Sequence, residues 1–70
     1  MFYKKNEPIQ NSIATSRKAV KLTQAELADT INVTRQTIIA IEKGNYTPSV
    51  LLALKLAYAL NKKVEELFWI

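Results

Sequence analysis

The segment 22–38 constrains the fold most, because it predicts two short helices joined by a tight turn. Thr23 and Glu26 have the spacing of a capping box, in which each side chain accepts a hydrogen bond from the backbone N–H of the other residue. Asn32 stands at the turn, and asparagine tolerates the left-handed backbone conformation that such a turn needs. Thr34 can cap the second of the two helices. The chain is therefore expected to be mainly helical.

Apolar residues recur at helical spacing along the remaining chain, which predicts an all-α fold of five helices. The expected helices run from Ile9 or Asn11 to Val20, from Gln24 to Thr30 or Ile31, between Thr34 and Gly44, from Val50 to Leu60 after the cap Ser49, and from Val64 to Phe68. The expected inward positions are Ile9, Ile13, Ala14, Val20, Leu27, Ala28, Ile31, Ile38, Ile41, Leu52, Ala53, Leu56, Ala57 and Leu60. Residues 1–8 are expected to form an arm, and residues 9–70 one domain.

Composition argues against an enzyme and against a metal or cofactor site. The 70 residues include no cysteine and no histidine, so thiolate ligands, the commonest metal ligand and the commonest general base are all missing. We therefore expect no catalytic residues, no bound metal and no cofactor.

Hydropathy and charge are compatible with a cytoplasmic protein that binds phosphates. No stretch of about 18 apolar residues is present, and the amino end does not resemble a signal peptide. A reducing compartment suits a chain without cysteine. The net charge of +4 and the pI near 9.6 permit binding to nucleic-acid phosphates.

The outward face of the third expected helix carries side chains that suit base recognition. Gln36, Ala40 and Lys43 lie opposite the apolar side of this helix, flanked by Arg35, Thr37 and Ile39. Arginine pairs with guanine and glutamine with adenine in the major groove, where the second helix of a helix-turn-helix unit can dock. Ile39 could contact a thymine methyl group, and the small Ala40 allows close approach. The alternative is a solvated helix face without a partner.

Glu42 falls toward the inner side of the same helix, where an unpaired carboxylate is costly to bury. Arg17 on the first helix is the expected partner, in a structural ion pair. The alternative, a catalytic acid, lacks a second carboxylate or nucleophile to work with.

The fourth expected helix is apolar on two sides. Opposite its core face lie Leu51, Leu54 and Tyr58, and a helix of this kind has a second surface to cover. We expect these residues, together with Trp69 and Ile70, to form a two-fold dimer interface. Alternatively, the carboxyl-terminal segment folds back over this face within one chain.

Residues 11–68 closely resemble the XRE family of helix-turn-helix repressors, which includes Cro and the lambda repressor. The resemblance rests on Leu22-Thr23-Gln24-Ala25-Glu26-Leu27-Ala28, Val33-Thr34-Arg35-Gln36-Thr37-Ile38, Ala40-Ile41-Glu42-Lys43-Gly44, Tyr46-Thr47-Pro48-Ser49, Leu52-Ala53-Leu54-Lys55-Leu56-Ala57 and Val64-Glu65-Glu66-Leu67-Phe68. It implies a compact five-helix bundle of the lambda-repressor type that binds double-stranded DNA as a homodimer at a pseudo-palindromic operator, most often as a repressor.

Site residues follow from the resemblance position by position. The implied base-reading set is Thr34, Arg35, Gln36, Thr37 and Ala40, the implied phosphate contacts are Gln24, Lys43, Asn45, Tyr46 and Thr47, and Arg17 and Glu42 match the structural pair of the family. In some short members the terminal segments form a small β-ribbon, for which Phe2-Tyr3 and Phe68-Trp69-Ile70 are the candidates. The remaining alternatives are an antitoxin that binds a toxin protein and represses its own operon, and an adaptor that uses the bundle for protein contacts alone. Regulation could come from concentration alone, from an antagonist protein or from proteolysis.

Overall fold

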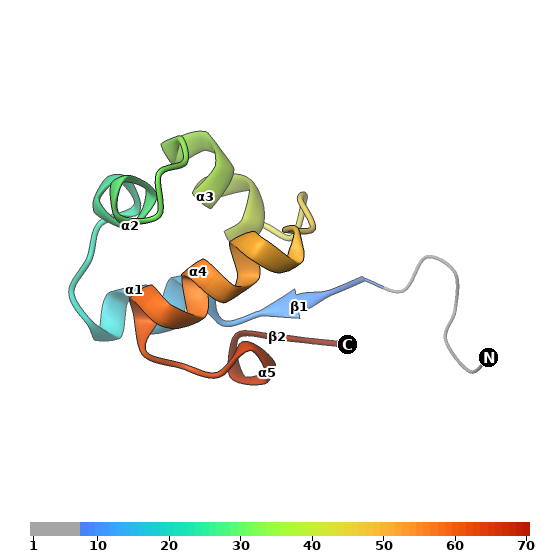
Figure 1. Ribbon diagram of the computed structural model, residues 1–70. Coiled ribbons are helices and arrows are strands. Elements are labelled where there is room, and N and C mark those ends of the chain that lie inside the picture. The colour runs from blue at the N-terminus through green and yellow to red at the C-terminus, as the bar shows by residue number, and fades with distance from the viewer. Residues whose placement is uncertain (1–7) are drawn as a thin grey trace.

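The computed structural model describes residues 8–70, and within them five helices are flanked by two short strands. The elements are β1 (Gln10–Asn11), α1 (Ile13–Ala19), α2 (Gln24–Thr30), α3 (Arg35–Glu42), α4 (Val50–Leu60), α5 (Val64–Leu67) and β2 (Phe68–Trp69). In Figure 1, α2 and α3 lie at one end of the bundle, the two strands and α5 at the other, and α4 between them. The predicted five-helix fold with α2 and α3 as the helix-turn-helix is confirmed.

Side-chain caps fix where the helices begin. The hydroxyl oxygens of Thr23, Thr34 and Ser49 accept hydrogen bonds from backbone N–H groups in the first turns of α2, α3 and α4, at 3.0, 3.3 and 3.1 Å. The carboxylate of Glu26 accepts from the Thr23 N–H at 2.8 Å, which completes the predicted capping box. The starts of these three helices are thus those that the sequence predicts.

The carboxyl ends of α1 to α4 share one geometry. Each is followed by a residue with positive φ: Lys21 (62°), Asn32 (59°), Gly44 (79°) and Asn61 (53°). The next residue in each case donates its N–H back to a carbonyl five positions earlier, as in Val33 to Ala28 at 2.9 Å. This is the Schellman arrangement, which favours glycine and asparagine at the left-handed position. Lys21 is the exception to this preference, and a lysine in the sequence does not predict a left-handed residue.

A single apolar core lies between the helices. The side chains of Ile13, Leu27, Ile38, Leu56 and Leu67 are fully buried, so that α1 to α5 each contribute at least one residue. Ala28, Ile31, Ile41, Leu52 and Leu60 complete the core. Burying one such aliphatic side chain contributes about 1.5–3 kcal/mol, and these contacts hold α2 and α3 against the other helices.

The first helix starts later than the sequence predicts. Residues 10–11 form β1, because the Ser12 N–H donates to the Leu67 carbonyl at 2.9 Å and the Asn11 side chain accepts from the Ile13 N–H at 3.1 Å. These bonds hold the segment extended and start the helix at Ile13. Ile9, predicted as a core residue, lies before this start and is 37% exposed, and Val20, also predicted as a core residue, lies just after the end of α1 and is 46% exposed.

The terminal ribbon differs from the predicted one in its partner strand. Phe68 leaves the last helix for β2, where Asn11 lies opposite Phe68 and Gln10 opposite Trp69 in antiparallel register. Phe2 and Tyr3, the predicted partners, lie outside the described residues, as does nearly all of the predicted arm. The predicted carboxyl-terminal strand is therefore confirmed for Phe68 and Trp69, whereas Ile70 lies outside β2.

The positive φ of Asn32 gives a test of the turn. Asn32→Val should lower the free energy of unfolding by about 1–2 kcal/mol, because a β-branched side chain is strained in the left-handed region. Asn32→Gly, the matched control, should leave stability nearly unchanged, since glycine adopts this conformation freely. Denaturant unfolding compares the two variants, and equal stability would contradict the assigned turn.

Candidate nucleic-acid interface

The first turn of α3 presents an exposed polar surface. Thr34, Arg35 and Gln36 are exposed, while Thr37 is half-buried. Ile38 is fully buried on the opposite side, so the core holds this helix by one face and leaves the other free. The helix thus offers hydrogen-bonding side chains at the end where a recognition helix usually enters the groove.

The middle of α3 is narrow on its outward side. Ile39 and Ala40 are half-buried, and Lys43 at the end of the helix is exposed. No long side chain stands between Gln36 and Lys43 on this face. A surface of this shape can approach the floor of a groove closely.

The loop after α3 continues the exposed polar surface. Lys43, Asn45, Tyr46 and Thr47 are all exposed, and the Tyr46 side chain retains 47% of its accessible area. Gly44, with φ of +79°, lets the chain leave the helix sharply. The predicted base-reading residues and the phosphate contacts predicted after the helix thus lie along α3 and the loop that follows it, between positions 34 and 47.

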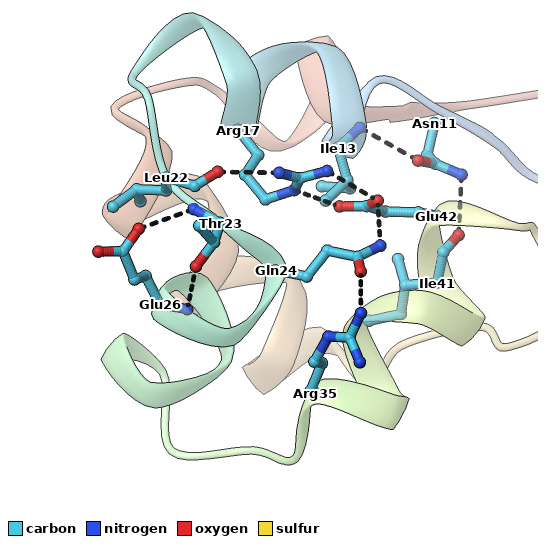
Figure 2. Close-up of polar contacts among 10 residues, drawn as sticks. All are labelled: Asn11, Ile13, Arg17, Leu22, Thr23, Gln24, Glu26, Arg35, Ile41 and Glu42. Carbon is cyan, nitrogen blue, oxygen red and sulfur yellow. Dashed lines mark hydrogen bonds and ion pairs between the residues drawn. The ribbon is translucent and has the colours of Figure 1, made fainter.

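A buried ion pair fixes the position of α3 against α1. The Arg17 Nε donates to Glu42 Oε2 at 2.7 Å and Nη2 donates to Oε1 at 3.3 Å, with both side chains less than one tenth exposed. The remaining guanidinium nitrogen, Nη1, donates to the Leu22 carbonyl at 2.8 Å, so Arg17 also holds the segment just before α2. Figure 2 shows this pair at the centre of the polar contacts. The pair is the one that the sequence predicts.

Gln24 connects this ion pair with the surface. Its Nε2 donates to Glu42 Oε1 at 3.0 Å, and its Oε1 accepts from Arg35 Nη2 at 3.3 Å. Figure 2 shows the side chain lying between the buried carboxylate and the exposed guanidinium. The sequence predicts Gln24 only as a phosphate contact, and the link to Glu42 and Arg35 was missed.

Asn11 is a second residue that the sequence analysis missed. Its Nδ2 donates to the Ile41 carbonyl at 3.0 Å while its Oδ1 accepts from the Ile13 N–H, so one amide joins α1 to the end of α3. An asparagine just before a helix indicates a cap, but its second contact depends on the tertiary arrangement.

The environment of Glu42 favours its charged form. Burial alone would raise the pKa of this carboxyl, but hydrogen bonds from Arg17 and Gln24, together with the charge of Arg17, outweigh it and hold the pKa below the usual 4.5. Glu42 therefore stays ionised at neutral pH and serves as a fixed structural anion.

The outer face of α4 is apolar and uncovered. Leu51, Leu54 and Tyr58 are 64%, 54% and 91% exposed, and Trp69 and Ile70 are 45% and 57% exposed. The carboxyl-terminal segment pairs with β1 and leaves this face open, so the alternative in which it folds back is wrong. Two surface hollows, of about 610 and 880 Å³, lie on either side of Leu54 and Tyr58.

Within residues 8–70, no group of three or more acidic side chains is placed to hold a metal ion. None of the helices described is long and apolar enough to cross a membrane.

Comparison with known proteins decides the family. A family model described as helix-turn-helix matches residues 13–67, which include α1 to α5. The chain belongs to the XRE-type helix-turn-helix family of DNA-binding transcriptional regulators. This family is one of transcription regulators and not of enzymes.

Two relatives of similar length support the assignment. An uncharacterised regulator of this type, YgzD from Bacillus subtilis, is 45% identical over 62 residues, covering 89% of this chain and 94% of its own length. A second, from Methanothermobacter thermautotrophicus, is 53% identical over 57 residues, covering 80% and 83% of the two chains.

Solved structures share the fold. The restriction-modification controller protein C.AhdI from Aeromonas hydrophila superposes with a TM-score of 0.72 at 31% identity, covering 77% of this chain and 82% of that protein. A protein from Bacteroides fragilis gives a TM-score of 0.79 at 23% identity, covering 87% of this chain and 98% of that protein, and shows the fold alone.

Removing one partner of the buried ion pair should destabilise the helix-turn-helix strongly. Glu42→Ala leaves the Arg17 guanidinium buried and unpaired, and such a loss costs about 3–5 kcal/mol. The matched double variant, Arg17→Met with Glu42→Leu, should be more stable than Glu42→Ala, because no charge then remains to be buried. Denaturant unfolding at neutral pH measures both, and a Glu42→Ala variant as stable as the wild type would contradict the role of the pair.

The lowered pKa of Glu42 predicts a loss of stability in acid. The ionised form stabilises the fold at pH values above 4.5, and this contribution is lost as the pH falls through the lower pKa of the folded state. Glu42→Gln cannot take up that proton, so its unfolding free energy should fall less steeply below pH 4.5. Parallel slopes for the two proteins would contradict the pKa assignment.

Proposed function

We propose that this protein is a sequence-specific regulator of transcription, acting as a repressor, that places α3 in the major groove of double-stranded DNA. The observation that carries the proposal is the exposed first turn of α3, with Arg35 and Gln36 at its tip, on a helix anchored by the buried Arg17–Glu42 pair. A rigid support matters because base recognition depends on side chains held within a fraction of an ångström.

Two side chains supply the strongest base recognition in this proposal. Arg35 pairs with guanine and Gln36 with adenine, and each such bidentate contact discriminates by about 1–3 kcal/mol. Thr34, Thr37 and Ala40 complete the base-reading set, and Ile39 contacts a thymine methyl group. Their common position on the outward side of α3 supports this assignment.

The loop after α3 contacts the DNA backbone. Lys43 contributes charge, and Asn45, Tyr46 and Thr47 contribute hydrogen-bond donors to phosphate oxygens. Neutralised phosphates release counterions, so binding is expected to weaken as salt rises.

The outer face of α4 forms a two-fold homodimer interface in the proposal. The exposed side chains of Leu51, Leu54 and Tyr58 form this interface together with Trp69 and Ile70, and the hollows next to Tyr58 can receive side chains of a second copy. An isologous contact needs such self-complementarity. A dimer places two α3 helices about 34 Å apart, in successive major grooves of a pseudo-palindrome with half-sites about 10 base pairs apart.

A cytoplasmic location accompanies this function. The relative YgzD comes from the bacterium Bacillus subtilis, in whose cells the DNA lies in the cytoplasm.

Selection of the purified protein on randomised duplex DNA at near-physiological salt tests the proposed function. We expect enrichment of a two-fold symmetric site. Uniform binding that disappears as salt rises would contradict sequence recognition, and co-purification of a stoichiometric partner protein would then favour an antitoxin or adaptor.

Substitutions on α3 should separate base contacts from backbone contacts. Arg35→Ala should reduce discrimination at one base pair of each half-site by about five-fold or more, since a bidentate pair is lost. Lys43→Ala should weaken binding to all sequences alike and reduce the salt slope by about one. Equilibrium titrations of both variants on the selected site and on randomised DNA make the comparison, and reversed effects would contradict the assigned roles.

A charge on the outer face of α4 should prevent dimer formation. Tyr58→Glu is expected to yield a folded monomer, because the side chain is 91% exposed in one chain but buried in the proposed dimer. Thr15→Glu, at an exposed position on α1, is the control and should remain dimeric. Sedimentation at tens of micromolar measures the mass, and a monomeric wild type would overturn the interface.

A further inference from the structure

We infer that Asn11 is a positioning residue that holds the carboxyl end of α3 and thereby places loop 43–47 for its contacts with the DNA backbone. This inference rests on the proposed function and deepens it, because it names the residue on which the strength of those backbone contacts depends. Asn11 lies in β1, outside the helix-turn-helix, and acts through the main chain of α3.

The amide of Asn11 joins two helices in one fixed orientation. Its Oδ1 accepts from the Ile13 N–H at 3.1 Å, in the first turn of α1, and its Nδ2 donates to the Ile41 carbonyl of α3 at 3.0 Å. Figure 2 shows the side chain between these two groups. The reversed amide would place an oxygen against the Ile41 carbonyl and an NH₂ group against the Ile13 N–H. Both ends of the amide are therefore set by main-chain groups.

The carbonyl that Asn11 binds is part of the turn that starts the loop. The Ile41 carbonyl also accepts from the Gly44 N–H at 3.0 Å, and the Ala40 carbonyl accepts from the Asn45 N–H at 2.9 Å. These two bonds make the Schellman turn after α3. A carbonyl oxygen has two lone pairs, so Asn11 and Gly44 bond to that of Ile41 without competing. The side chain of Asn11 thus holds the point from which the loop leaves the helix.

Packing contributes little to the position of the loop after α3. Residues 43–47 are all exposed. A Cβ atom added at Gly44 would meet no atom within 4 Å, so steric contact does not fix the turn there. The direction of the loop therefore depends on the hydrogen bonds at the end of α3. The Arg17–Glu42 pair holds this end through a side chain, whereas Asn11 bonds the main chain that continues into the loop.

The segment that carries Asn11 is itself held firmly. Its main chain lies in the ribbon, where Asn11 is opposite Phe68 in β2. The next residue, Ser12, donates its N–H to the Leu67 carbonyl at 2.9 Å and its hydroxyl to the Glu66 carbonyl at 2.8 Å. Asn11 thus connects the end of α3 with a segment that is bonded to β2 and to α5.

The contacts that this anchor supports differ from those proposed to read bases. Arg35 and Gln36 lie in the first turn of α3, whereas Ile41 lies in its last turn. Hydrogen bonds to phosphate oxygens carry no sequence information and weaken steeply when the donor is misplaced. A loop that shifts therefore loses affinity on every sequence alike. Loss of the Asn11 contact should weaken binding without relaxing base discrimination.

The test uses Asn11→Asp, which breaks the contact with α3 and keeps the one with α1. The carboxylate still accepts from the Ile13 N–H, but it has no donor for the Ile41 carbonyl. Binding to the site obtained by selection and to randomised duplex DNA should weaken by the same factor, about three- to ten-fold, the effect of losing about one hydrogen bond. Equilibrium titrations measure both. Discrimination at the base pair that Arg35→Ala identifies, and the salt slope, should stay unchanged.

Two further measurements distinguish positioning of the loop from a general loss of structure. Asn45→Ala removes one proposed phosphate contact, and its combination with Asn11→Asp should cost less affinity than the sum of the two single losses. The combination of Asn11→Asp with Arg35→Ala should instead be additive. Without DNA, amide hydrogen exchange at Gly44 should become faster in Asn11→Asp, while exchange in α2 stays unchanged.

Controls separate this role from the effects of charge and folding. Gln10→Glu adds the same charge at the neighbouring exposed residue and should bind as the wild type does. Asn11→Ser keeps a hydroxyl that can cap α1 but is too short to reach α3, and it should reproduce the effect of Asn11→Asp if that variant folds poorly in a thermal melt.

Three outcomes would overturn the inference: wild-type affinity in a folded Asn11 variant, a loss that simply adds to that of Asn45→Ala, and a loss of discrimination at the base pair assigned to Arg35. Failure to select any site would contradict the proposed function instead.

Discussion

The buried pair of Arg17 and Glu42 is the interaction on which the remaining structure depends. It lies where α1, the segment just before α2 and the end of α3 meet. The three guanidinium nitrogens of Arg17 donate two hydrogen bonds to the Glu42 carboxylate and one to the Leu22 carbonyl. A charged pair in this position adds little net stability over an apolar pair, because both ions lose their hydration. The pair instead fixes the orientation of α3 relative to α1, since a bidentate pair tolerates few relative orientations of its two helices. The helix-turn-helix is thereby joined to the bundle in one orientation.

The same interaction connects the core with the surface that we propose to bind DNA. Glu42 holds the amide of Gln24, and that amide holds Arg35 at the tip of α3. A small domain has few residues with which to support a recognition helix, and here a single buried carboxylate both orients the helix and fixes one of its side chains. The apolar face of α4 lies on a different helix, so pairing of two copies and recognition of bases need not compete for the same residues.

Local signals made much of the fold predictable from sequence. Thr23, Thr34 and Ser49 cap helices and Gly44 ends one, because capping depends on residues within one helical turn. The Arg17–Glu42 pair was also predictable, since a carboxylate on an inward face requires a partner. Other features were not predictable, because they depend on contacts between distant segments. Ser12 bonds to Leu67 and delays α1, Asn11 reaches Ile41, and Gln24 bridges Glu42 and Arg35. The Ser12 N–H and the side chains of Asn11 and Gln24 each have several possible partners in the sequence, and only the packing of the helices selects among them.

In the function that we propose, α3 contacts the floor of the major groove. Methylation interference on the selected duplex tests it directly, because a methyl group on guanine N7 blocks a major-groove contact while one on adenine N3 blocks the minor groove. We predict interference from guanine N7 in two clusters about 10 base pairs apart on one face of the duplex, and none from adenine N3. Interference confined to adenine N3, or none at any base despite tight binding, would contradict recognition by α3.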